Sequence, residues 1–179
     1  MYKRQDLEVL LACAANNDLI PEKILLTHGH IDHAAGATEL ASILNLKIVG
    51  PNIDDKFLLD ELEAQGSMLG ISAQNCSPDF WLDDGDTISV GNAKLDVFFT
   101  PGHSPGHIIF FHKPSNLAIV GDVLFAGSIG RTDLPGGDYS QLINSIKTKL
   151  WPLGENIEFV PGHGPASNFK IERSVSYTH

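Results

Sequence analysis

Hydrophobic residues recur three and four positions apart in several stretches of the chain, which is the spacing of a helix with one apolar face. This pattern predicts helices at residues 6–17, 34–46, 51–65 and 139–150. In the second of these helices we expect Leu40, Ile43 and Leu44 to point inward. The four segments supply the helical part of the predicted fold.

Short runs of apolar and β-branched residues, bounded by Gly, Pro, Asn or Asp, predict strands between these helices. They lie at residues 22–27, 47–50, 87–90, 94–100, 108–112, 117–120 and 157–160. Residues 66–79 follow neither period and are expected to form an irregular loop over one face. Because no internal change in composition marks a linker, the pattern predicts one α/β domain.

The two ends of the chain differ in character from the rest. Residues 1–5 and 174–179 resemble translations of a transposon sequencing adapter, read on opposite strands. We therefore expect a single, incomplete domain at residues 6–173, flanked by two non-native ends. A genomic codon run that encodes both ends without adapter sequence would refute this interpretation.

The charge balance and the cysteine content narrow the classes of partner and compartment. The 179 residues include 12 Lys and Arg against 22 Asp and Glu, a formal net charge of −10. Such an acidic surface repels phosphate backbones, so nucleic acid is not an expected partner. The apolar runs are strand-sized, so no membrane is expected as a partner, and the N-terminus lacks the apolar stretch of a secretory signal. Cys13 and Cys76 alone cannot form a disulfide framework, which favours a reducing, cytoplasmic location.

Histidine and aspartate follow four of the predicted strands, each time beside Gly or Pro. The four segments are His28-Gly-His-Ile-Asp-His33, Pro101-Gly-His103, Gly121-Asp122 and Pro161-Gly-His163. Carboxyl ends of strands are where α/β folds place functional loops, and Gly lets the backbone approach a bound ion closely. Four imidazole and carboxylate groups within six residues exceed what a solvated loop needs. Without a thiolate, this donor set suits zinc, iron or manganese in a reactive site rather than a closed structural site.

Other polar features of the sequence receive structural interpretations. His107 and His112 flank a predicted strand and are expected to be structural or to support the metal ligands, and His179 belongs to the second non-native end. The acidic run 83–86 is typical of a turn rather than of a calcium loop. Residues 127–130 lack the spacing of a Gly-x-Ser-x-Gly nucleophile turn, and no glycine loop with Lys and Ser or Thr predicts phosphate binding.

The His-x-His-x-Asp-His run at 28–33, followed in order by His103, Asp122 and His163, resembles the metallo-β-lactamase superfamily. In detail the chain is similar to glyoxalase II, the hydroxyacylglutathione hydrolases, and in particular to short bacterial hydrolases without a separate C-terminal helical domain. The resemblance implies an α/β fold, an αββα sandwich with a metal centre at one edge. It also implies that N-terminal strands of the family are missing here and that the chain stops early, so we expect an exposed sheet edge and poor expression.

The resemblance implies roles for individual residues as well. The seven expected ligands form two groups joined by a bridging carboxylate: His28, His30 and His103 for one ion, Asp32, His33 and His163 for the other, and Asp122 for both. The expected cofactor is one or two divalent metal ions, zinc first, with iron or manganese as alternatives. Asp32 and Asp122 would act in catalysis by holding the ions and orienting the nucleophile. Arg131 would meet a substrate carboxylate, or lie on the surface without such a role.

The reaction implied by this resemblance is hydrolysis of a thioester such as S-lactoylglutathione, through a metal-bound hydroxide that attacks the carbonyl. The main alternative is an iron-dependent persulfide dioxygenase, with a single iron held by the equivalents of His28, His103 and Asp122. Another hydrolase of the same fold and a metal-binding protein without activity also stay open. A flavodiiron module usually carries Glu where this chain has His30, and a nuclease would need a basic groove, so both are disfavoured. Thiol release compared with oxygen uptake distinguishes the first two reactions.

Overall fold

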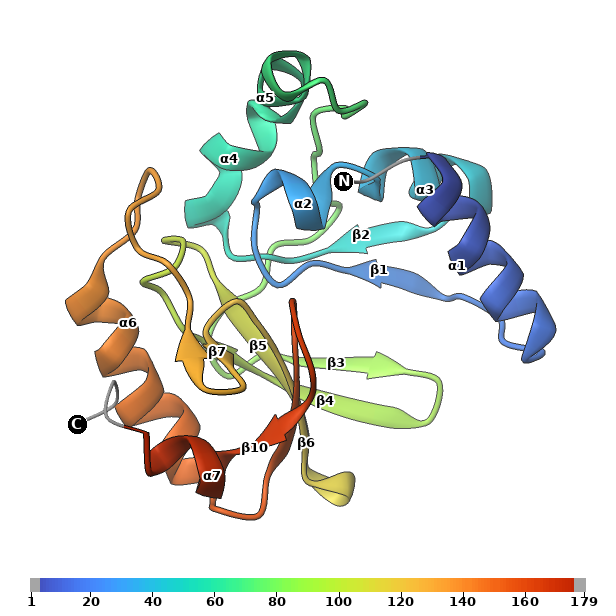
Figure 1. Ribbon diagram of the computed structural model, residues 1–179. Coiled ribbons are helices and arrows are strands. Elements are labelled where there is room, and N and C mark those ends of the chain that lie inside the picture. The colour runs from blue at the N-terminus through green and yellow to red at the C-terminus, as the bar shows by residue number, and fades with distance from the viewer. Residues whose placement is uncertain (1–3, 176–179) are drawn as a thin grey trace.

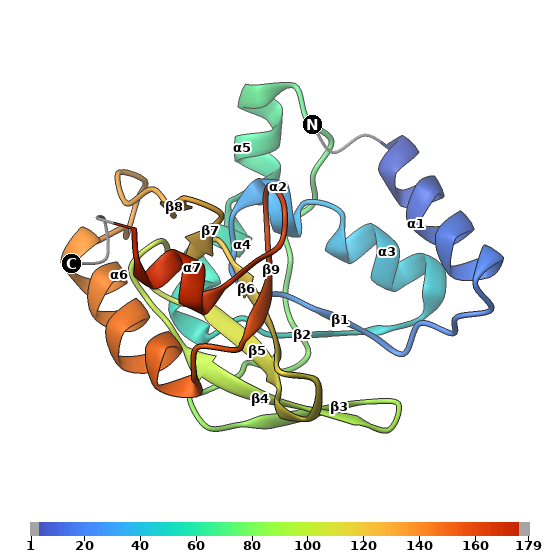
Figure 2. The same ribbon diagram turned by 60° about the horizontal axis from the view of Figure 1, so that its bottom comes forward.

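Two β-sheets lie face to face between two layers of helices (Figures 1 and 2). The computed structural model describes residues 4–175. Its helices are α1 (Arg4–Asn16), α2 (Ile31–Ala34), α3 (Ala37–Leu44), α4 (Lys56–Asp60), α5 (Leu62–Leu69), α6 (Tyr139–Ser145) and α7 (Phe169–Arg173). Its strands are β1 (Lys23–Leu25), β2 (Lys47–Val49), β3 (Thr87–Val90), β4 (Ala93–Phe99), β5 (Ile108–His112), β6 (Leu117–Gly121), β7 (Leu124–Phe125), β8 (Ser128–Ile129), β9 (Glu158–Pro161) and β10 (Ser167–Asn168). The expected αββα sandwich is confirmed.

The larger sheet has the order β10-β9-β6-β5-β4-β3, and the smaller one pairs β1 with β2 in parallel. Within the larger sheet all neighbours are antiparallel except β6 and β9, which run parallel. A separate hairpin joins β7 to β8. The parallel pair places the carboxyl ends of β6 and β9 at the same edge of the sheet, next to each other.

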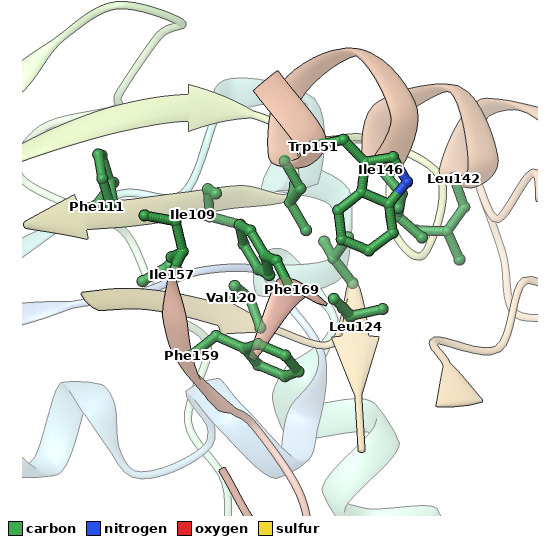
Figure 3. Close-up of a cluster of buried hydrophobic side chains, with 13 residues drawn as sticks. Ile109, Phe111, Val120, Leu124, Leu142, Ile146, Trp151, Ile157, Phe159 and Phe169 are labelled. Carbon is green, nitrogen blue, oxygen red and sulfur yellow. The ribbon is translucent and has the colours of Figure 1, made fainter. Parts of the chain in front are cut away.

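Alternation along β5 shows how the layers are held together. Ile108 and Phe110 face the smaller sheet and pack with Val49, whereas Ile109 and Phe111 face the opposite side. On that side the core is formed with α6 and α7, where Phe159 and Phe169 are fully buried (Figure 3). Successive side chains of a strand point to opposite faces of the sheet. A strand that is buried on both faces therefore has a continuous run of apolar residues in its sequence.

A third cluster of buried residues closes the other outer layer. Leu26, directly after β1, and Ile48 of β2 pack against Ala34, Ala37, Leu59 and Leu62 from α2 to α5. The described part of the chain, residues 4–175, has no helix with the length and apolar character needed to cross a bilayer.

Three of the predicted helices have different bounds in the structure. The helix predicted at 6–17 is α1, which extends from Arg4 to Asn16. The helix predicted at 34–46 is wrong as one segment: α2 already starts at Ile31, and α3 starts after Gly36 and ends where Asn45 turns left-handed at φ 52°. Ile43, expected inside, is 54% exposed, because the face of α3 that packs on the core carries Ala37 and Ala41, with Leu40 and Leu44 half-buried beside it.

The segment predicted as one helix at 51–65 consists of a 3-10 turn, α4 and α5. Because α5 continues to Leu69 and is ended by Gly70 at φ 67°, the loop predicted at 66–79 begins four residues later. The helix predicted at 139–150 is confirmed in extent as α6 and a following π-helical turn. Of the ends predicted to be non-native, residues 1–3 and 176–179 lie outside the described residues.

We expect Asp138→Ala to lower the free energy of unfolding by about 1 kcal/mol. The Asp138 side chain caps α6 by accepting a 2.9 Å hydrogen bond from the backbone N–H of Gln141. Urea unfolding of the metal-free protein measures the loss. Asp138→Asn retains a capping oxygen and serves as the control, so an equal loss in both variants would contradict the capping explanation.

Candidate metal centre

The seven predicted ligands come together at one edge of the sandwich. His28 and His30 lie in the turn after β1, and Asp32 and His33 lie in α2, which begins directly behind that turn. His103 lies in the loop between β4 and β5, Asp122 follows β6, and His163 follows β9. Residues up to 135 positions apart in the sequence meet here, because the segments that follow β1, β6 and β9 and the loop between β4 and β5 all lie at this edge.

Three buried imidazoles form the first group, which holds His28, His30 and His103. One ring nitrogen from each lies within 4.8 Å of the others. Nδ1 of His30 is 2.9 Å from Nε2 of His103. Burial keeps these rings uncharged: it lowers the pKa of His28 well below the ordinary value, and with the neighbouring His103 it lowers that of His30 to about 4. Neutral rings offer lone pairs to a cation.

The second group, formed by Asp32, His33 and His163, is more exposed. Nε2 of His163 lies 3.0 Å from Oδ2 of Asp32 and 3.1 Å from Nε2 of His33. Burial alone would lower the pKa of His33, but the carboxylates of Asp122 and Asp32 outweigh it and raise that pKa. The group combines imidazole nitrogens with a carboxylate oxygen, as divalent transition metals prefer.

The carboxylate of Asp122 lies between the two groups. Its Oδ2 is 3.6 Å from Nε2 of both His103 and His163, and its Oδ1 is 3.4 Å from Nε2 of His33. Burial opposes ionisation of Asp122, but the close imidazole of His33 and those of His103 and His163 keep the pKa of this carboxyl below its ordinary value. One ionised side chain therefore faces both groups.

The donor set fits one or two bound cations. Among the described residues, Nε2 of His28, Nε2 of His30 and Oδ1 of Asp122 are buried without a hydrogen-bond partner. Buried polar atoms are normally paired, so three unpaired nitrogen and oxygen atoms in one cluster indicate a missing partner. Imidazole and carboxylate in these positions suit zinc, iron or manganese, and their chemistry alone does not select one of them.

Neighbouring groups hold the ligand rings in defined orientations. Nδ1 of His103 donates to the carbonyl oxygen of Arg131 at 2.8 Å, which leaves Nε2 directed toward the cluster. His107, expected to be structural or to support the metal ligands, is fully buried and stacks on His28 with ring centroids 4.8 Å apart. Its Nε2 accepts from the backbone N–H of Asp122 at 3.1 Å. His112 lies away from the cluster, where its Nδ1 contacts Ser115 Oγ.

Sequence reasoning did not identify Asp55 as part of this region. Its carboxylate is fully buried and accepts hydrogen bonds from Gly29, Ser104 and Gly106, which belong to the two loops that carry His28, His30 and His103. Burial raises the pKa of the Asp55 carboxyl, with these hydrogen bonds acting in the opposite direction. In the sequence Asp55 is one of two adjacent aspartates, and no local pattern separates it from the exposed Asp54.

A pocket of about 560 Å³ opens beside the two groups. Five apolar residues line it together with the metal-centre side chains: Ile31, Leu69, Phe125, Ile129 and Leu134. Gln65, Ser128 and Arg131 add polar groups. Arg131 reaches the pocket wall but forms two 2.7 Å hydrogen bonds with the carboxylate of Asp133. The pocket is large enough for a small organic substrate and mixes apolar walls with few polar contacts.

Comparisons with known proteins agree with this arrangement. Residues 17–163 match the family model described as the metallo-beta-lactamase superfamily. The chain is 42% identical over 158 residues to the hydroxyacylglutathione hydrolase GloC of Haemophilus influenzae, an alignment that covers 87% of this chain and 74% of that protein. Its structure resembles the BLEG-1 B3 metallo-beta-lactamase, with a TM-score of 0.87 at 30% identity over 99% of this chain and 91% of the other. It also resembles TTHA1623, solved in a di-iron-bound form, with a TM-score of 0.84 at 34% identity over 94% and 82% of the two chains.

Proposed function

The chain belongs to the metallo-beta-lactamase superfamily and is a metallo-hydrolase of that superfamily, and we propose that the bond it cleaves is a thioester, as in S-lactoylglutathione. The observation that carries this proposal is the position of Asp122, whose carboxylate faces both of the adjoining groups of metal donors beside an open pocket. The similarity to a hydroxyacylglutathione hydrolase over most of the chain supports the substrate class.

Each ligand group has a defined task in this proposal. His28, His30 and His103 would hold one ion, and Asp32, His33 and His163 would hold the other, with Asp122 shared. A bound divalent ion polarises the thioester carbonyl and lowers the pKa of a coordinated water toward neutrality. We propose zinc as the resident metal. Iron, found in the di-iron form of TTHA1623, and manganese are the alternatives to be measured.

The protein's own side chains then act on water and substrate. Asp122 holds its carboxylate ionised between the two groups, so it fixes the position from which water attacks. Asp32, the exposed carboxylate at the pocket wall, is placed to orient that water through Oδ2. The apolar residues Phe125 and Ile129 exclude bulk water from one side of the substrate.

The role of Arg131 stays a prediction of the same proposal. To bind a substrate carboxylate, the guanidinium must exchange its paired hydrogen bonds to Asp133 for bonds to the substrate. Because both side chains are largely exposed, the Arg131–Asp133 ion pair contributes little to stability, and a substrate carboxylate can replace Asp133. A glutathione-linked substrate and the predicted cytoplasmic location belong together, since free thiols persist in a reducing compartment.

The assay that tests the proposal loads the metal-free protein separately with Zn²⁺, Fe²⁺ and Mn²⁺ and measures thiol release from S-lactoylglutathione. We expect metal-dependent release with kcat/KM on the order of 10⁴ M⁻¹s⁻¹ or above. S-Methylglutathione, a thioether without a carbonyl bonded to its sulfur, is the control and should release no thiol.

Parallel assays distinguish the competing functions. Oxygen uptake with glutathione persulfide would identify a dioxygenase, and opening of a β-lactam without thioester cleavage would identify another hydrolase of this fold. Stoichiometric metal binding without any of these reactions would identify a metal-binding protein and contradict the proposed activity.

A further inference from the structure

A buried carboxylate supports the first ligand group from behind. Asp55 lies at the start of α4, between the loop of residues 28–33 and the loop of residues 101–107. No ion pair among residues 4–175 involves Asp55. The buried carboxylate is therefore stabilised by hydrogen-bond donors. The positions of these donors show which segments of the chain Asp55 holds together.

All three donors belong to the loops that carry the first group. Oδ2 of Asp55 accepts from the backbone N–H of Gly29 at 2.7 Å and from Ser104 Oγ at 2.8 Å. Oδ1 accepts from the backbone N–H of Gly106 at 2.5 Å. Gly29 separates His28 from His30, and Ser104 directly follows His103. One side chain thus joins the His28 and His30 loop to the His103 loop.

The same two loops pack closely on the backbone of Asp55. A Cβ atom added to Gly106 would lie 2.4 Å from the Asp55 nitrogen, and one added to Gly29 would lie 3.1 Å from the Asp55 carbonyl oxygen. Glycine is therefore needed at position 106, whereas a side chain at position 29 would require its neighbours to shift slightly. None of the hydrogen bonds of Asp55 reaches α2, which carries Asp32 and His33, and none reaches the loop of His163 or the end of β6.

We propose that Asp55 is a positioning residue that sets the distance between the imidazole pair His28 and His30 and the imidazole of His103, and so sets the affinity of the first ion. This inference rests on the metal centre of the proposed function and deepens it. Because the second group receives no bond from Asp55, the effect is selective for one of the two ions.

The test isolates each ion by deleting one ligand of the other. In a His163→Ala background only the first group is complete, and in a His103→Ala background only the second. Asp55→Asn is introduced into both. An asparagine offers one acceptor oxygen, so its NH₂ group must face an N–H or O–H donor in either orientation. Zn²⁺ affinity is measured by competition with a chromophoric chelator, and Co²⁺ absorption reports the ligand geometry.

We expect Asp55→Asn to weaken Zn²⁺ binding about 10–100-fold in the His163→Ala background. In the His103→Ala background we expect a change within about twofold, as for independent sites. The Co²⁺ spectrum should change only in the first background. Equal affinities with and without Asp55→Asn, or equal losses in both backgrounds, would overturn the proposal. Absence of Zn²⁺ binding by the His163→Ala protein itself would instead overturn the metal centre on which it rests.

Two further variants control for a general loss of stability. Ser104→Ala removes one of the three donors, and we expect a smaller loss in the same direction; it decides the question if Asp55→Asn does not fold. Glu172→Gln alters another buried carboxylate, which accepts from Gly127 and Ser167, two residues outside the loops of His28, His30 and His103. It should leave Zn²⁺ affinity unchanged in both backgrounds. A loss like that of Asp55→Asn would show that any buried carboxylate has this effect and would contradict positioning.

Discussion

Replacing Asp122 with alanine is expected to lower kcat/KM for thioester hydrolysis at least about a thousandfold, or about 4 kcal/mol of transition-state stabilisation. The reason is that one carboxylate faces both donor groups, with 3.4–3.6 Å between its oxygens and the Nε2 atoms of His33, His103 and His163. Removing it leaves the imidazoles without the negative charge that offsets two cations, so bound metal should fall below one ion per chain.

Chelation provides the complementary measurement. Removing metal from the unmodified protein should abolish thiol release, and adding Zn²⁺ back should restore it, whereas Asp122→Ala should not recover. Asp60→Ala is the control, since Asp60 is an exposed carboxylate that pairs with Lys56 on α4. An Asp122→Ala protein that is folded, metal-loaded and active would contradict the assigned site.

Gly162→Ala should lower kcat/KM about a hundredfold and weaken the second ion. A Cβ atom at this position would lie 2.2 Å from Oδ1 of Asp122 and 2.6 Å from Cε1 of His33. Contacts this short cannot be tolerated, so either the Asp122 carboxylate or the turn that carries His163 must move. A displacement near 1 Å in a catalytic group is enough for an effect of this size.

Gly164→Asn is a matched control for the same turn. Gly164 has φ 80° and nothing within 4 Å of an added Cβ, and asparagine tolerates the left-handed region better than other side chains. Metal analysis and kinetics of both variants separate the steric effect on Asp122 from a general change in the turn. Equal activity of Gly162→Ala and the unmodified protein would show that the close approach has no catalytic consequence.

The sequence predicts β5 well because burial on both faces leaves a continuous apolar run bounded by turn residues, whereas β3 is largely exposed and is marked by its β-branched residues and bounding turns. The bounds predicted for β3 and β5 coincide with those in the structure. The convergence of the His and Asp residues follows from the same reasoning, since loops at the carboxyl ends of neighbouring strands must meet. The interpretation of that cluster as a metal centre depends on its imidazole and carboxylate ligand atoms, which follow directly from the residue types in the sequence.

Other parts could not be predicted because they depend on tertiary contacts. β7 and β8 have two residues each, too few to show an alternating pattern. Ile43 has the spacing of an inward residue but lies beyond the narrow face that α3 presents to the core. Asp55 is adjacent to another aspartate, and only the folded loops supply the three donors that make its burial favourable.

The parallel pairing of β6 with β9 has a consequence for how the protein reaches its active state. Parallel neighbours require a long crossover, here residues 122–157, so their contact forms only after a large loop has closed. His163 is delivered by this late step, whereas the ligands up to Asp122 are already present in the preceding segment. During synthesis a nascent chain would therefore acquire a partial metal-binding site first, and ion uptake and the last stage of folding would be kinetically coupled.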